Sequence, residues 1–116
     1  MIHQFGPGDF LIFQLESGYG LLRVLAIDEA DSIWHLTAYE DLFLDTDTAD
    51  GAVENNSLRV SIPHIALTNR AFEATQVAKL SHRELTADEL LAYDRWVDDP
   101  AHEISDTSIR LLLGLR

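Results

Sequence analysis

The chain has 116 residues, of which 47% are apolar, and this size and composition predict a single domain spanning residues 1–116 with one hydrophobic core. It contains no cysteine, which excludes disulfides, thiolate zinc sites and cysteine nucleophiles and agrees with a reducing compartment. Its formal net charge of −12 repels phosphate backbones and anionic lipid, so neither nucleic acid nor a membrane is expected as a partner.

Three strands are predicted in the first 39 residues. Residues 10–15 and 21–27 are short apolar runs separated by a glycine-containing segment, which is typical of an antiparallel hairpin. Residues 33–39 return to aromatic and β-branched side chains and predict a third strand. With a period of two, Trp34, Leu36 and Ala38 share one face, which we expect to be the core face.

The segment after the third strand is polar and acidic from residue 44 to residue 56, and we expect a solvated, mobile loop there. Its acids resemble a calcium loop only superficially, because their spacing does not fit the required ligand register. A fourth strand is predicted over residues 58–62, ending at Pro63. Residues 64–80 fit either a strand end followed by a short helix or further strand, and the sequence leaves the two open.

The C-terminal third is expected to be helical. Thr86 and Glu89 form a capping-box pattern, which predicts a helix over residues 87–97 that ends before Pro100. The apolar run 109–115 favours a second short helix, with Asp106 as its cap. The predicted fold class is therefore α+β: a small, curled antiparallel (SH3-like barrel) sheet in the N-terminal half, with one or two helices in the C-terminal third.

No catalytic motif is recognisable. The chain lacks a nucleophile elbow, a phosphate-binding glycine loop and a close metal-ligand spacing among its five histidines, so no catalytic residue, cofactor or metal is expected. Abundant carboxylates carry no signal, because twenty acids form pairs by chance.

A set of side chains could nevertheless line a binding patch through ring faces, amides and a guanidinium: His35, Tyr39, His64, Asn69 and Arg70. The alternative interpretation is that His35 and Tyr39 decorate an exposed sheet face and that Arg70 pairs with a nearby acid. A small enzyme or ligand-binding protein would require His35, Tyr39, His64 and Arg70 to converge in one pocket.

The N-terminal part of the chain resembles the start of a small bacterial β-barrel. The resemblance lies in the glycine placement at Gly6–Phe10, the hairpin Gly18–Leu25 and the Trp-His-Leu-Thr run after it. Together with the blocks 63–72 and 110–116, the chain resembles a family of small, uncharacterised bacterial (cyanobacterial-type) proteins, a resemblance that implies no activity. Over its first ~40 residues it is also similar, in strand pattern, to the immunity proteins of polymorphic toxins.

The charge distribution suggests what kind of partner to expect. Residues 1–58 hold eleven acids and one base, Arg23, whereas residues 59–116 hold nine acids and seven bases. An acidic half of this kind would steer in a basic protein, so the leading hypothesis is a non-enzymatic, immunity-like protein-binding module. Simple solubility also explains the charge, and a homodimer covering leucines 111, 112, 113 and 115 is a further possibility. The N-terminus lacks signal-peptide character, so we expect a cytoplasmic protein.

Overall fold

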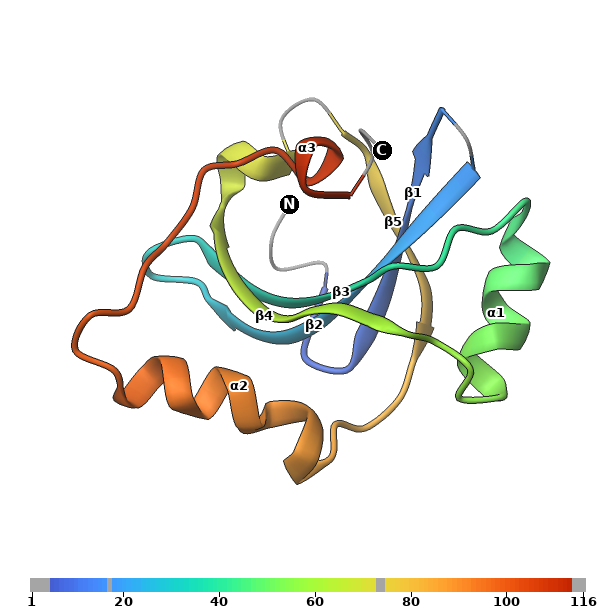
Figure 1. Cartoon of the computed structure of the whole chain (residues 1–116). Coiled ribbons are helices and arrows are strands. Elements are labelled where there is room, and N and C mark those ends of the chain that lie inside the picture. Colours follow the sequence, from blue (N-terminus) through green and yellow to red (C-terminus); the bar gives the residue numbers. More distant parts are fainter. Residues whose placement is uncertain (1–4, 17, 73–74, 114–116) are drawn as a thin grey trace.

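The computed structural model describes residues 5–16, 18–72 and 75–113. Figure 1 shows its elements, which follow one another along the chain as β1 (Asp9–Leu15), β2 (Gly18–Asp28), β3 (Ile33–Tyr39), α1 (Thr46–Glu54), β4 (Val60–Thr68), the 3₁₀ helix η2 (Asn69–Phe72), β5 (Val77–His82), α2 (Ala87–Asp98) and α3 (Ile109–Leu113).

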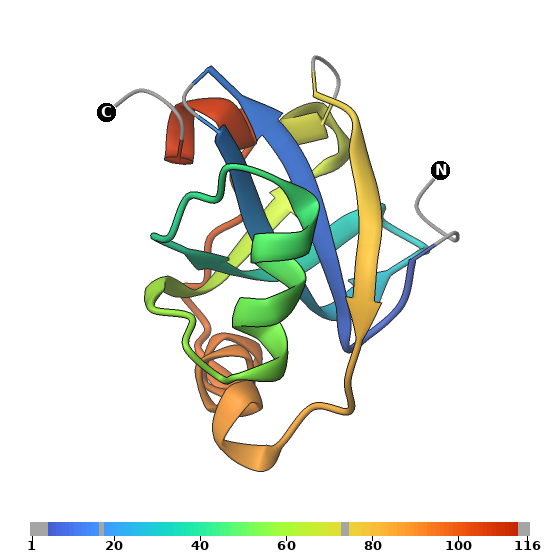
Figure 2. The ribbon, with the colours of Figure 1, turned by 90° about the vertical axis from the view of Figure 1, so that its right-hand side faces the viewer.

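The five strands form one antiparallel sheet in the order β4-β3-β2-β1-β5. Register shifts interrupt the β1–β5, β2–β3 and β3–β4 pairings, and such irregularities bend strands and increase their twist. The sheet is therefore strongly curled, although β4 and β5 remain its two edges and do not close it into a barrel (Figure 2). The predicted α+β class and the curled antiparallel sheet are confirmed.

Two hydrophobic clusters lie on the two faces of the sheet. The larger one includes Leu11, Phe13, Trp34 and Leu36, and Ile109 of α3 closes it. The smaller one combines Phe10, Ile12, Leu21, Tyr39 and Phe43 with the α1 side chains Ala49 and Val53. Figures 1 and 2 both show α3 at one end of the curled sheet and α2 at the other.

Strand β3 is buried along its whole length, on both faces. The expectation that Trp34, Leu36 and Ala38 face the core is confirmed. The interpretation of the opposite face as exposed is wrong: His35 and Tyr39 are only 3% and 8% exposed. The physical reason is that helices packed against that face cover it, which strand periodicity alone cannot reveal.

The acidic segment after β3 is a helix rather than a mobile loop. Asp45 caps α1, because its side chain accepts a hydrogen bond from the Thr48 amide at 2.8 Å. Ala49 and Val53, four residues apart, are buried against the sheet. These two small apolar residues at helical spacing anchor the segment to the sheet. The polar and acidic composition of residues 44–56 masks this pattern, which is why a loop was predicted.

Residues 64–80 contain both of the alternatives that the sequence left open. Strand β4 runs on through Pro63 to Thr68, and the proline is tolerated because β4 is an edge strand. The short helix η2 follows, and then comes β5, an edge strand whose side chains are exposed or half-buried.

The predicted helix over residues 87–97 is α2, and both hydrogen bonds of the Thr86–Glu89 capping box are present. The terminal run also begins as the helix α3, but Asp106 is not its cap. The Asp106 carboxylate instead accepts a hydrogen bond from the Thr68 hydroxyl of β4. Among the described residues, no helix combines the length and apolar character needed to cross a membrane.

Candidate functional site

Three of the five predicted binding residues project from the sheet towards α2. His35 and Tyr39 stand on the same face of β3, since they are four residues apart in a strand. His64 of the neighbouring strand β4 meets His35, with 3.0 Å between His35 Nδ1 and His64 Nε2. The histidine pair was predicted only as two separate candidates, and the β3–β4 pairing brings them together.

Aromatic side chains of α2 cover the histidine pair. The His35 ring centroid lies 4.7 Å from those of Tyr93 and Trp96, and His64 lies within 5.8 Å of both. Trp96 in turn stacks on His102 at 3.9 Å. We call these five rings the aromatic cluster: His35, His64, Tyr93, Trp96 and His102.

Burial holds the histidine pair in its neutral form. Desolvation lowers the pKa of His35 and lowers that of His64 to about 4, and each effect is reinforced by a neighbouring histidine. In the neutral pair one ring nitrogen donates and the other accepts, so their contact at 3.0 Å satisfies both groups. This hydrogen bond joins β3 to β4, and the packing of Tyr93 and Trp96 on the two neutral rings holds α2 against the sheet.

The other two predicted residues lie elsewhere. Asn69 of η2 accepts a hydrogen bond from the Trp34 indole at 2.7 Å, on the core side of β3. Arg70 is exposed, and within the described part of the chain its side chain forms no ion pair. His35, Tyr39, His64 and Arg70 thus do not line one pocket.

A second polar centre surrounds Arg23 of β2, which is 4% exposed. Its guanidinium forms an ion pair with Glu89 of α2 and donates to the carbonyl oxygens of Arg83 and Glu84 at 2.8 and 3.2 Å. It also lies over the Phe10 ring, 4.5 Å from the centroid. A buried arginine needs this number of partners, because an unpaired buried charge is strongly unfavourable.

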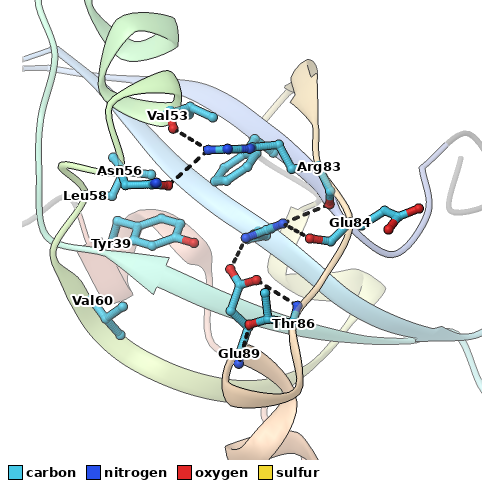
Figure 3. A pocket seen from close by; sticks show the side chains of 11 residues that line it. Tyr39, Val53, Asn56, Leu58, Val60, Arg83, Glu84, Thr86 and Glu89 are labelled. Carbon is cyan, nitrogen blue, oxygen red and sulfur yellow. Dashed lines mark hydrogen bonds and ion pairs between the residues drawn. The ribbon is translucent and has the colours of Figure 1, made fainter.

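An open cavity of about 390 Å³ lies beside this arginine, and we call it the Arg83 cavity. The end of α1, the start of β4 and the β5–α2 connection surround it (Figure 3). Its lining residues are Phe10, Arg23, Tyr39, Val53, Asn56, Leu58, Val60, Arg83, Glu84, Thr86 and Glu89.

Tyr39 is the one predicted binding residue in this lining. Figure 3 shows its hydroxyl pointing towards the middle of the cavity. Burial raises the pKa of Tyr39, with the Arg23 charge acting in the opposite direction, so its phenol stays protonated and able to donate at neutral pH.

A third feature is the outer face of α1. Asp47, Asp50 and Glu54 follow one another at i, i+3 and i+7, which places them on one stripe of the helix, away from the buried residues. In the described part of the chain no base lies within ion-pair distance of these three acids. Leu42 and Leu44, just before the helix, are 47% and 86% exposed. These five residues are the acidic α1 surface.

Sequence reasoning missed most of the residues that build these centres. Arg23 did stand out as the single base among residues 1–58, inside an apolar strand, and a lone charge in such a run signals a buried partner. Tyr93 and Trp96 lie within the helix predicted over residues 87–97, but nothing in the sequence marked them as part of a site. Arg83 carried no local signal, because its role depends on where β5 ends.

Over the described ranges, no group of three or more histidines and acids is arranged to hold a metal ion. Comparisons of the chain with protein-family models, with curated proteins and with solved structures found no match.

Proposed function

We propose that this protein is a non-enzymatic binding module that docks a basic protein on its acidic α1 surface. The observation that carries the proposal is the stripe formed by Asp47, Asp50 and Glu54, three carboxylates that have no described base within ion-pair distance, together with the exposed side chain of Leu44 just before the helix. The most specific form of this proposal is that the protein inhibits a basic toxin, as an immunity protein does.

Asp47 lies in the first turn of α1, where the helix dipole favours an acid, but the rest of the stripe opposes the helix that carries it. Asp47 and Asp50, and Asp50 and Glu54, are like-charge neighbours at i,i+3 and i,i+4, each costing about 0.2–0.5 kcal/mol in an isolated helix. Glu54 also stands at the C-terminal end, where the helix dipole disfavours an acid. A bound cationic surface would relieve both effects, and an apolar anchor such as Leu44 would supply the buried contact that charge alone lacks.

The alternative of a small enzyme or ligand-binding protein built on the histidines takes second place. The two nitrogens that face each other in His35 and His64 are engaged together, and Tyr93 and Trp96 pack over their rings. These groups are occupied in holding α2, which favours a structural role for them.

The test compares three forms of the tagged protein as baits in a lysate of the source organism. The first is the wild type, and the second removes the stripe with Asp47→Asn, Asp50→Asn and Glu54→Gln. The third is a matched control that removes three exposed acids of the α2 region with Asp94→Asn, Asp98→Asn and Glu103→Gln. We expect a basic protein to be retained by the wild type and the control and to be lost by the stripe variant.

The retained protein is then purified and titrated against the wild type at low and high salt. Electrostatic steering predicts an association rate that falls roughly tenfold or more as the salt is raised. Retention that is equal for all three baits, association that is indifferent to salt, or a wild-type bait that retains nothing would each contradict the proposal.

A further inference from the structure

The Arg83 cavity has the size and the mixed character of a small-molecule site. Its volume of about 390 Å³ lies in the range of ligand pockets, which is roughly 300–1,000 Å³. Apolar side chains form part of its wall, and polar groups converge from three separate elements (Figure 3). The chemistry of the ligand follows from which of these polar groups are already occupied.

Several acceptor atoms around the cavity already hold a hydrogen bond. Glu89 uses one oxygen for the Arg23 guanidinium and the other for the Thr86 amide, at 2.9 Å. The Val53 carbonyl and the Asn56 side-chain oxygen both accept from Arg83, at 2.8 and 3.0 Å. A ligand that mainly donates hydrogen bonds would therefore share these oxygens with the donors that already hold them.

Three further polar groups of the lining can donate. Arg83 uses only Nη1 in these contacts, so two further nitrogens of its guanidinium are available. The Tyr39 hydroxyl points into the cavity; it accepts from the Arg23 side chain, so its own proton can still be donated, and the amide nitrogen of Asn56 takes no part in the hydrogen bonds drawn in Figure 3. Three donor groups from three elements thus surround one space.

The local charge balance favours a single negative charge on the ligand. Arg23 and Glu89 form an ion pair and cancel each other. No described carboxylate lies within ion-pair distance of Arg83, and Figure 3 shows the Glu84 carboxylate directed away from Tyr39 and Asn56. One unpaired guanidinium in a molecule of net charge −12 can neutralise a monoanion, whereas a phosphate dianion would keep an excess charge in a repulsive field.

From this geometry we infer that the Arg83 cavity binds a small organic monocarboxylate with an apolar body. Its carboxylate lies against the Arg83 guanidinium, which matches the two oxygens with a planar pair of donors, and within reach of Tyr39 and Asn56. Its apolar body packs against Phe10, Leu58 and Val60. This site is separate from the acidic α1 surface and does not depend on the protein-binding proposal.

Three probes distinguish this ligand chemistry from its alternatives: benzoate, its neutral counterpart benzyl alcohol, and inorganic phosphate. Each is titrated into the ¹⁵N-labelled full chain, and amide chemical shifts are followed around Tyr39, Asn56 and Arg83. We expect saturable shifts with benzoate, and binding of benzyl alcohol and of phosphate that is at least several-fold weaker. Equal binding of benzyl alcohol, or tighter binding of phosphate, would overturn the assignment.

Two pairs of variants locate the site. Arg83→Gln removes the guanidinium and should weaken benzoate binding about tenfold or more, whereas Arg70→Gln removes an exposed arginine elsewhere and should leave it unchanged. Because Arg83 also bridges Val53 and Asn56, the second pair avoids these contacts. Val60→Asp puts a negative charge on the cavity wall, and Val97→Asp makes the same change on α2; both valines are 50% exposed.

Benzoate binding that is lost in Val60→Asp and kept in Val97→Asp, with both variants showing cooperative thermal unfolding, supports the site. Equal binding by the two aspartate variants would show that benzoate binds elsewhere and would overturn the inference. Neither result bears on the proposal that a basic protein binds the acidic α1 surface, because Asp47, Asp50 and Glu54 are unchanged in all four variants.

Discussion

The contacts of Arg23 show how single residues decide the arrangement of this fold. A guanidinium in the second strand contacts the α2 carboxylate of Glu89 and the backbone of residues 83 and 84, so it fixes where the chain leaves β5 and where α2 begins. Removing one partner of such a pair is far more costly than the pair is worth, because the other charge stays buried. The position of the Arg83 cavity thus depends on one buried cation.

Gly8 holds the other side of the same connection. Its amide donates to the Val24 carbonyl at 2.8 Å, and its own carbonyl accepts from the Arg83 amide at 3.0 Å. Its φ of +93° is a conformation that favours glycine, and a Cβ atom there would lie 2.4 Å from the Arg83 carbonyl oxygen. Backbone, rather than a flexible side chain, fills the space that any larger residue would need.

We therefore expect Gly8→Ala to lower the free energy of unfolding by about 2 kcal/mol or more, since strain and close contact both oppose the new methyl group. Urea unfolding followed by circular dichroism measures the change. Gly6→Ala is the matched control, because no atom lies within 4 Å of its added Cβ; we expect a change within about 0.5 kcal/mol. Equal stability of the two variants would show that the Gly8 backbone relaxes freely.

At the scale of elements, α2 is fastened to the sheet from its two ends rather than through a buried apolar stripe. None of its residues counts as fully buried, and Leu91 and Val97 are about half exposed. Glu89 holds the N-terminal end through Arg23, and Trp96 holds the other end through His35, His64 and a hydrogen bond to the Glu103 carbonyl.

The histidine pair makes this attachment sensitive to pH. Its pKa is lowered in the folded protein, to about 4 for His64, whereas an unfolded histidine titrates near 6.5. The native state is thus the poorer proton acceptor, and stability is fully present above about pH 6.5 and is lost as the pH falls from there towards 4. The charges facing the pair do not reverse this sign: Asp28 raises the pKa of His35, but burial and His102 lower it more.

The expected result is an acid transition in which α2 separates from the sheet. Fluorescence of Trp96, which stacks on His102, should change between about pH 6.5 and 4, while Trp34 in the core stays protected. Single-tryptophan variants, Trp34→Phe and Trp96→Phe, separate the two signals. A His64→Phe variant keeps a ring in this position and should shift the transition to lower pH; an unchanged transition would assign it to the carboxylates.

The same elements show what sequence can and cannot predict. The first three strands and the capping box of α2 were predicted because their signals are local: apolar runs, glycines and a four-residue cap. For the region of η2 the sequence left helix and strand open. Helix α1 was missed because only Ala49 and Val53 reveal its buried face, and β5 because an edge strand with exposed or half-buried side chains lacks alternation. The cavity combines Tyr39 of β3 with Arg23 of the neighbouring strand β2 and with Arg83 of the β5–α2 connection, and no spacing along the chain predicts that these three residues meet.

At the scale of the whole molecule, charge and apolar surface act in opposite directions on self-association. Leu111 of α3 is 59% exposed, whereas Leu112 packs against the core, and the side chains of residues 113 and 115 lie outside the described set. The homodimer expected from the terminal leucines therefore stays a prediction, and it would have to bring two copies of a net charge of −12 together.

The same excess charge predicts how salt acts on stability. The molecule extends 39 × 30 × 27 Å, so many pairs of its carboxylates are farther apart than the Debye length of about 10 Å at 0.1 M salt. Added salt therefore screens the repulsion between them. Salt also weakens the attractive pairs, but exposed ones such as Arg59 with Glu40 and Asp41 contribute only about 0–1 kcal/mol. With twenty acids against eight bases, relief of repulsion outweighs this loss.

We expect the free energy of unfolding at pH 7 to rise by about 1 kcal/mol between about 0.02 M and 0.3 M sodium chloride, measured by urea unfolding. A variant with Asp47→Lys and Asp50→Lys changes the net charge from −12 to −12 + 2 × 2 = −8, and its stability should depend less on salt. If salt instead destabilises the wild type, attractive contacts such as the ion pairs of Arg23 with Glu89 and of the buried Asp9 with Lys79 dominate its electrostatics. The excess charge is then carried by groups far enough apart to be harmless to the fold.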